Sequence, residues 1–124
     1  MELKNPLYKN IGVHVVSSIF TVDKGVVKVL LIKRTNEPFK DYWALPGGAM
    51  YNNELIVDAA KRELKEKTGI DDVNLSMYKV IDSIDRSPIR RMIAICFIGV
   101  MDIKKVELLK YTSKTSDIGW VDII

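Results

Sequence analysis

The sequence predicts a domain of mixed α and β structure, and three observations carry this prediction. Residues 11–22 and 26–33 are rich in β-branched side chains and flank a short turn, the pattern of a β-hairpin. Residues 54–68 repeat apolar side chains at about the 3.6-residue period of a helix. Residues 91–101 are almost wholly apolar, as expected for a central strand that is covered on both faces.

The elements before the helix follow from turn chemistry. Asp23-Lys24-Gly25 is the expected turn of the hairpin, because glycine accepts the backbone angles of a tight turn. A polar loop is expected over residues 35–42, and a short strand over residues 43–45. Leu45-Pro46-Gly47-Gly48 is predicted to be a turn, since proline and paired glycines continue neither a strand nor a helix.

The helix over residues 54–68 has signals at both ends. Asn52 or Asn53 is the expected N-cap, and Gly69 is the expected C-terminal stop. The rest of the chain completes the sheet. We expect strands over residues 73–84, 91–101 and 118–123, a turn over residues 85–88 and a loop over residues 113–117.

Composition indicates an ordinary globular chain. Its 124 residues are enough for one domain with a genuine core, so residues 1–124 are expected to form a single domain. The chain is 48% hydrophobic and 28% charged. The net charge of +3 comes from interspersed residues of both signs, and no direct binding of nucleic acid is expected.

The expected location is the cytoplasm. The one cysteine, Cys96, lies in an apolar run and is expected to be a buried thiol. A single cysteine forms no internal disulfide, which suits a reducing compartment. The chain has no apolar stretch long enough to span a bilayer and no signal-peptide pattern, so no membrane contact is expected.

Carboxylates gather on one face of the predicted helix. Glu63 and Glu66 share that face with Lys67, because residues three and four apart are neighbours on a helix. Arg62 follows Glu54 by about two turns, where a salt bridge braces it. Glutamate oxygens together with a backbone carbonyl from the Gly47-Gly48 turn suit Mg²⁺, which bridges protein carboxylates and substrate phosphates. The alternative is an ordinary solvated helix face.

The stretch from Gly48 to Ile70 resembles the Nudix box. That motif specifies nine positions, and this chain matches eight of them. The lead-in Trp43-Ala44-Leu45-Pro46-Gly47-Gly48 is also similar to the one common in the family. The resemblance implies an α/β/α sandwich with a mixed β-sheet, here lacking the usual C-terminal helix. Because a missing helix leaves apolar sheet surface exposed, we expect a homodimer.

The resemblance also implies a metal-dependent hydrolase of the Nudix (MutT-like) superfamily. Such enzymes cleave a nucleoside diphosphate linked to another moiety, using Mg²⁺ or Mn²⁺. Glu63, Glu66 and the carbonyl of Gly47 would be metal ligands, and Glu63 or Glu66 would hold the attacking water. Glu54 and Arg62 would be the bracing pair of the catalytic machinery.

One position departs from the motif, because Lys67 stands where the family has a glutamate that is typically a main metal ligand. A lysine at that point disfavours a second cation nearby. We predict a hydrolase with a compensated or weakened metal site, and the alternative is a nucleotide-sensing domain with little or no turnover. The replacement oxygens considered are Asp82, Asp85, Asp102 and Glu107.

The favoured substrate class is ADP-ribose-like. The local sequence resembles ADP-ribose pyrophosphatases and the Nudix domain of transcriptional regulators of NAD metabolism, although a hydrolase for damaged nucleoside triphosphates shares the same motif. Arg34 and Arg86 are the candidate phosphate ligands, since a guanidinium donates hydrogen bonds in pairs. Gly48 and Phe39 complete the candidate substrate site, with Tyr42 and Tyr51 as further stacking surfaces. His14 is interpreted as a core or interface residue and Trp43 as a core residue.

Overall fold

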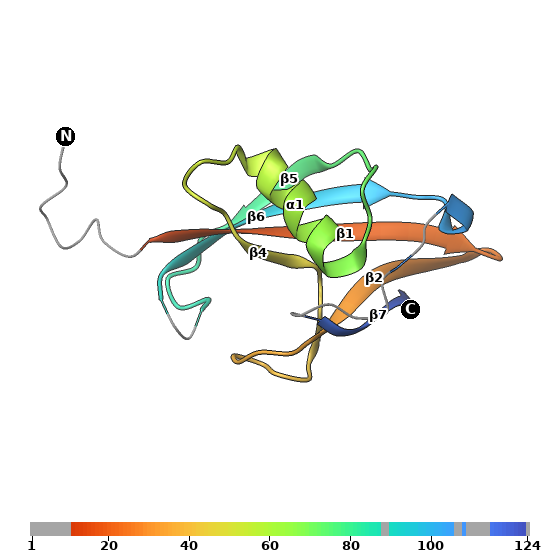
Figure 1. The fold of residues 1–124 in the computed structure, drawn as a ribbon, viewed down its shortest axis with the longest axis horizontal. Coiled ribbons are helices and arrows are strands. Elements are labelled where there is room, and N and C mark those ends of the chain that lie inside the picture. The colour runs from red at the N-terminus through yellow and green to blue at the C-terminus, as the bar shows by residue number, and fades with distance from the viewer. Residues whose placement is uncertain (1–10, 88–89, 106–107, 109–114, 124) are drawn as a thin grey trace, which may run out of the picture.

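The structure is a computed structural model, and it describes residues 11–87, 90–105, 108 and 115–123. Within these residues one α-helix lies on one face of a seven-stranded mixed sheet (Figure 1), which confirms the predicted combination of α and β structure. The elements in chain order are β1 Gly12–Asp23, β2 Val26–Arg34, β3 Trp43–Ala44, β4 Gly47–Ala49, α1 Ile56–Thr68, β5 Ser76–Ile81, β6 Met92–Val100, the 3₁₀ turn η2 Ile103–Lys105 and β7 Thr115–Asp122.

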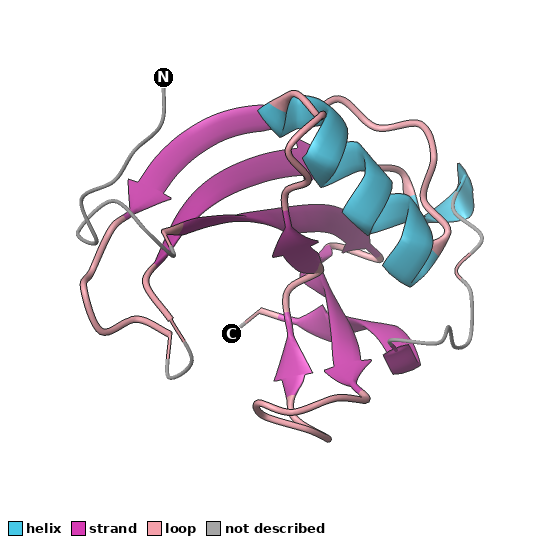
Figure 2. Cartoon of the chain, turned by 60° about the vertical axis from the view of Figure 1, so that its left-hand side comes forward, coloured by secondary structure: helices cyan, strands magenta, loops and turns pink. Residues whose placement is uncertain are grey.

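The sheet forks along strand β1. The path of paired strands is β3-β2-β1-β6-β5, with β4 added to β1 and β7 added to β2. β1 and β6 run parallel, from Gly12 opposite Met92 to Phe20 opposite Val100, and the other pairs are antiparallel. On its other edge β1 pairs first with β4 and then with β2, so the two parts of the sheet diverge (Figure 2).

The helix α1 covers the part of the sheet that contains β1, β4 and β6 (Figure 1). Its small residues Ala59 and Ala60 pack against Val15, Ile95 and Phe97, all of them buried. Because small residues let the helix approach the sheet closely, burial of this apolar face fixes the position of the charged residues one turn further along. The helix ends at Gly69, as predicted, with φ +83°.

The start of the helix differs from the prediction. The N-cap is Leu55, which makes no side-chain cap hydrogen bond, so the predicted cap at Asn52 or Asn53 is wrong. Glu54 lies in the turn before the helix, where its carboxylate accepts a 2.8 Å hydrogen bond from the backbone N–H of Tyr51. That carboxylate also binds Arg62, and this tertiary contact, rather than an asparagine cap, organises the turn.

The glycine pair also differs from its predicted form. Gly47 and Gly48 lie in strand β4, which pairs with Val16 and Val15 of β1, so the predicted glycine turn is wrong. A Cβ on Gly47 would lie 2.4 Å from the backbone oxygen of Val15. Glycine is needed here for close approach of two backbones rather than for a turn.

Three strand boundaries shift by three residues each. The predicted strand over residues 73–84 shortens to Ser76–Ile81, and β7 begins at Thr115, inside the predicted loop. Residues 113–114 of that loop lie outside the described residues. The predicted hairpin turn is confirmed, because Lys24 and Gly25 both have positive φ between the paired residues Asp23 and Val26.

Candidate functional site

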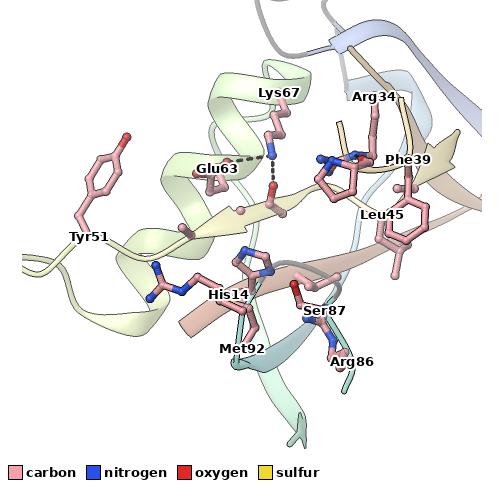
Figure 3. Close-up of a pocket in the computed structure, with 17 residues that line it drawn as sticks. His14, Arg34, Phe39, Leu45, Tyr51, Glu63, Lys67, Arg86, Ser87 and Met92 are labelled. Carbon is pink, nitrogen blue, oxygen red and sulfur yellow. Dashed lines mark hydrogen bonds and ion pairs between the residues drawn. The ribbon is translucent and has the colours of Figure 1, made fainter. Parts of the chain in front are cut away.

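A pocket of about 690 Å³ lies where the sheet forks. Its walls come from β1, the β3–β4 segment, helix α1 and the two segments that carry Arg34 and Arg86 (Figure 3). This volume lies within the range of small-molecule sites. Four of the described lining side chains are cationic and one is a carboxylate: Arg34, Lys67, Arg86, Arg90 and Glu63. The pocket therefore favours an anionic ligand.

Lys67 contacts two of the three groups that the motif assigns to the metal ion. Its ammonium donates a hydrogen bond to the carbonyl oxygen of Gly47 and lies 3.3 Å from Oε2 of Glu63 (Figure 3). Both side chains are buried, with 9% of Lys67 and 4% of Glu63 exposed. An ammonium buried this deeply is stable only when paired, and here the pairing groups are those that would otherwise hold a metal.

Gly48 makes room for the Glu63 carboxylate. A Cβ at this position would lie 2.5 Å from the carboxyl carbon of Glu63, closer than two such atoms approach. Oε1 of Glu63 accepts a 2.8 Å hydrogen bond from Arg62, while the buried Oε2 has the Lys67 ammonium at ion-pair distance but no hydrogen bond. The carboxylate is thus fixed between a guanidinium and an ammonium.

Arg62 joins the acidic residues of the motif. Its Nε and Nη2 donate to Glu54 at 2.5 and 3.0 Å, and its Nη1 donates to Glu63 and, at 3.3 Å, to Glu66. Nη2 also donates to the carbonyl of Ala49 in β4. The bonds to Glu54 raise the pKa of Arg62 and lower the pKa of Glu54. Arg62 therefore ties the helix, the preceding turn and β4 together.

Glu54 and Glu66 stand apart from the pocket. Neither is among the residues that line it, and the Glu66 side chain is 45% exposed. The bracing contact predicted between Glu54 and Arg62 is present in the structure. This contact holds the turn before α1 in place. The catalytic role assigned to Glu54, Arg62 and Glu66 stays a prediction.

The residues around Lys67 do not fit a divalent metal ion. Two of the three predicted ligands, Glu63 and the carbonyl of Gly47, contact the ammonium. Within the described residues, no group of three or more histidine, cysteine, aspartate or glutamate side chains is placed to hold a metal. Of the replacements considered, Asp82, Asp85 and Asp102 lie outside the pocket lining, and Glu107 lies outside the described residues. A magnesium or manganese cofactor stays a prediction that rests on the family resemblance.

The predicted phosphate ligands do reach the pocket. Arg34 and Arg86 both line it, together with Gly48 and Phe39. The Nε of Arg34 donates a 2.8 Å hydrogen bond to the carbonyl of Pro38, which folds the loop back on the strand end. The next residue, Phe39, has φ +63°, a strained value for an aromatic residue, and its ring is half exposed beside the pocket.

His14 lines the pocket, whereas the sequence indicated a core or interface residue. It lies on β1 opposite Ala49 of β4 and Ala94 of β6, and its ring faces the pocket (Figure 3). Burial lowers the pKa of His14, and the charges of Arg86 and Lys67 lower it further. The available signal was strand alternation, because Val13 and Val15 point to the helix side and leave His14 on the opposite face.

Tyr51 is a second aromatic at the pocket. Its ring lies under the guanidinium of Arg62, with the Cζ atom 3.8 Å from the ring centroid. Tyr42, by contrast, is not among the lining residues, and it packs against Phe39 at a centroid distance of 5.9 Å. Two aromatic surfaces, Tyr51 and Phe39, therefore stand at different places on the pocket wall (Figure 3).

Comparison with known proteins defines the class. The NUDIX domain family matches residues 12–123, so the chain belongs to the Nudix family. It is 34% identical over 108 residues to the ADPR responsive transcriptional repressor NtrR of Acinetobacter baylyi, covering 86% of this chain and 42% of that protein. It is 46% identical over 71 residues to the ADP-ribose pyrophosphatase of Methanocaldococcus jannaschii, covering 57% of this chain and 42% of that protein.

A solved structure shares the whole fold. The NUDIX domain of Shewanella oneidensis NrtR, solved in complex with ADP ribose, superposes with a TM-score of 0.85 at 25% identity, covering 95% of this chain and 77% of that chain. The chain spans less than half the length of both curated relatives. The similarities therefore define the family. Separately, no helix within the described residues has the length and apolarity to cross a membrane.

Proposed function

We propose that this Nudix domain binds ADP-ribose, or a closely similar nucleotide sugar, in the pocket lined by Arg34 and Arg86. The observation that carries the proposal is the charge of the lining, which contains four cationic side chains and one carboxylate. Guanidinium groups donate paired hydrogen bonds to phosphate oxygens, so the two arginines suit the diphosphate. Gly48 and Phe39 complete the proposed substrate site, and the similarity to proteins named for ADP-ribose supports the ligand class.

Isothermal titration with ADP-ribose tests this proposal. Arg86→Met is expected to raise the Kd by about tenfold, the effect of losing one charged hydrogen-bonding group. Lys61→Met is the matched control, because Lys61 is an exposed cation of α1 outside the pocket. An unchanged Kd in Arg86→Met, or an equal loss in both variants, would contradict the proposed site.

Of the two functions that the sequence leaves open, the contacts of Lys67 favour binding with little or no turnover. Glu63 and the Gly47 carbonyl, which hydrolysis would require as metal ligands, are engaged by the ammonium. We therefore expect a ligand-sensing domain. Its relative in Acinetobacter baylyi carries the name of an ADPR responsive repressor, and any partner domain or DNA contact of the present protein lies beyond this proposal.

Hydrolysis of the pyrophosphate is the second candidate, favoured by the similarity to an ADP-ribose pyrophosphatase. In that case Glu63, Glu66, Glu54 and Arg62 form the catalytic set and Mg²⁺ or Mn²⁺ is required. Phosphate release from ADP-ribose, NADH, diadenosine polyphosphates and nucleoside triphosphates distinguishes the two. Turnover that Glu66→Gln abolishes would establish the hydrolase, whereas silence with an ADP-ribose-dependent rise in Tm supports the sensor.

Three broader predictions go with this proposal. We expect a single domain over residues 1–124, a cytoplasmic location and a homodimer. The dimer is supported by apolar side chains that are exposed on the sheet face opposite α1, among them Val22, Val27 and Val100.

A further inference from the structure

We propose that Lys67 is a tethered cation that takes the place of the divalent metal ion at the ligand diphosphate. ADP-ribose would then bind equally well with and without divalent cations. This inference rests on the proposed function for its ligand. The exclusion of a divalent metal ion by Lys67 does not depend on the identity of that ligand.

The ammonium of Lys67 bonds to the carbonyl of Gly47 and pairs with Oε2 of Glu63 at 3.3 Å. Carboxylate and carbonyl oxygens are the ligands that a hard cation such as Mg²⁺ takes. The lysine therefore places its own positive charge among oxygens of the type that a metal ion would use.

The Lys67 side chain is 9% exposed and that of Glu63 is 4% exposed, so the pair is shielded from solvent. Charges in such surroundings interact strongly, and a second cation beside the ammonium would be repelled. Glu63 is also held from its other side by Arg62 at 2.8 Å, so its carboxylate is already compensated twice. A divalent ion would have to displace the ammonium to reach it.

Lys67 and Glu63 line the pocket, which also contains Arg34, Arg86 and Arg90. Figure 3 shows the Lys67 side chain descending from α1 to the carbonyl at the edge of the pocket. A metal in this family carries positive charge to the phosphates. Here the covalently attached ammonium supplies positive charge at the same edge of the pocket, without requiring a dissolved ion.

The test compares ADP-ribose binding by calorimetry in EDTA and in Mg²⁺. For the wild-type domain we expect the same Kd in both, within about twofold. Lys67→Gln, which removes the charge without adding a ligand, is expected to raise the Kd about tenfold in both conditions. A lysine with a purely structural role would change the Tm of that variant and leave its Kd unchanged, which would overturn the proposal.

Lys67→Glu restores the glutamate of the motif and gives the more discriminating comparison between EDTA and Mg²⁺. It is expected to bind ADP-ribose weakly in EDTA and to recover about tenfold on addition of Mg²⁺. Lys65→Glu is the matched control, because Lys65 is on the same helix, 61% exposed and paired only on the surface with Asp71. Melting curves establish that each variant is folded, and Lys67→Gln keeps the test decisive if the acidic variant unfolds.

Manganese alone separates this inference from the proposed function. Electron paramagnetic resonance of Mn²⁺ without nucleotide is expected to show binding to Lys67→Glu and none to the wild type. Manganese binding by the wild type, or a tenfold gain in wild-type affinity for ADP-ribose with Mg²⁺, would overturn the role of Lys67. Failure of the wild type to bind ADP-ribose under any condition would instead refute the proposed function, while the manganese comparison still decides whether Lys67 excludes the metal.

Discussion

The carboxylate of Glu63 lies directly against the α-carbon of Gly48, where a Cβ would come within 2.5 Å of its carboxyl carbon. Strand β4 and helix α1 approach each other closely at this point because Gly48 has no side chain. The motif glycine therefore serves the position of a buried acid, and through that acid the position of Lys67.

We expect Gly48→Ala to lower the free energy of unfolding by about 1–3 kcal/mol, because the added methyl displaces a buried carboxylate. It should also weaken ADP-ribose binding. Gly119→Ala in β7 is the control, since its Cβ would meet nothing within 4 Å. Urea denaturation measures both variants, and equal stability of Gly48→Ala and Gly119→Ala would contradict the observed packing.

Arg62→Met is expected to destabilise the fold by about 2 kcal/mol, because buried Glu63 loses a charged hydrogen bond. Lys61→Met, the neighbouring exposed position, should change the free energy of unfolding by less than about 0.5 kcal/mol. Chemical denaturation compares the two. Similar values for both would mean that Arg62 contributes no more than a surface charge.

Acid should weaken the fold in part through Glu54. The hydrogen bond from Arg62 lowers the pKa of Glu54 in the folded state below its ordinary value of 4.5. The unfolded chain then takes up the proton first, so this stabilisation is present above pH 4.5 and is lost as pH falls through the lowered pKa. Unfolding curves measured down this range should fall less steeply for Arg62→Met than for the wild type. Parallel curves would be inconsistent with this linkage.

The pKa of His14 is expected to respond to the charge of the bound ligand. It is the one histidine of the chain, so its ring signals are assigned at once by NMR. Burial holds the pKa of free His14 below 6.5. A bound diphosphate favours the charged ring, so ADP-ribose should raise this pKa, and affinity should increase as pH falls through the range between the bound and free values. A pKa that stays constant or falls on binding would place the diphosphate away from His14.

Self-association should depend on the sheet face opposite α1. Paired residues of β1, β2 and β6 place Val22, Val27 and Val100 on that face, and Val100 is 73% exposed. Light scattering over a concentration series is expected to give a dimer mass that Val100→Lys reduces. Ile84→Lys, at an 81% exposed position in the loop after β5, should leave it unchanged. A monomer mass for the wild type throughout would refute the dimer.

Local patterns were reliable where one element decides its own structure. The hairpin around Lys24 and Gly25, the end of the helix at Gly69 and the apolar strand Met92–Val100 follow from turn chemistry and periodicity. The predicted turn at the glycine pair is wrong because glycine is selected both by tight turns and by close approach of two chain segments. At Gly47 and Gly48 the requirement was close approach, to Val15 and to Glu63.

The sequence by itself determined the family, the helix and the identity of the charged residues, because the spacing of the motif is a property of the chain. Only the tertiary structure decided which of those charges meet. The partnership of Lys67 with the Gly47 carbonyl spans twenty residues, and it exists because α1 packs on β4. His14 likewise lines the pocket because the sheet forks beside it. Contacts between distant residues depend on the packing of whole elements, which no local pattern encodes.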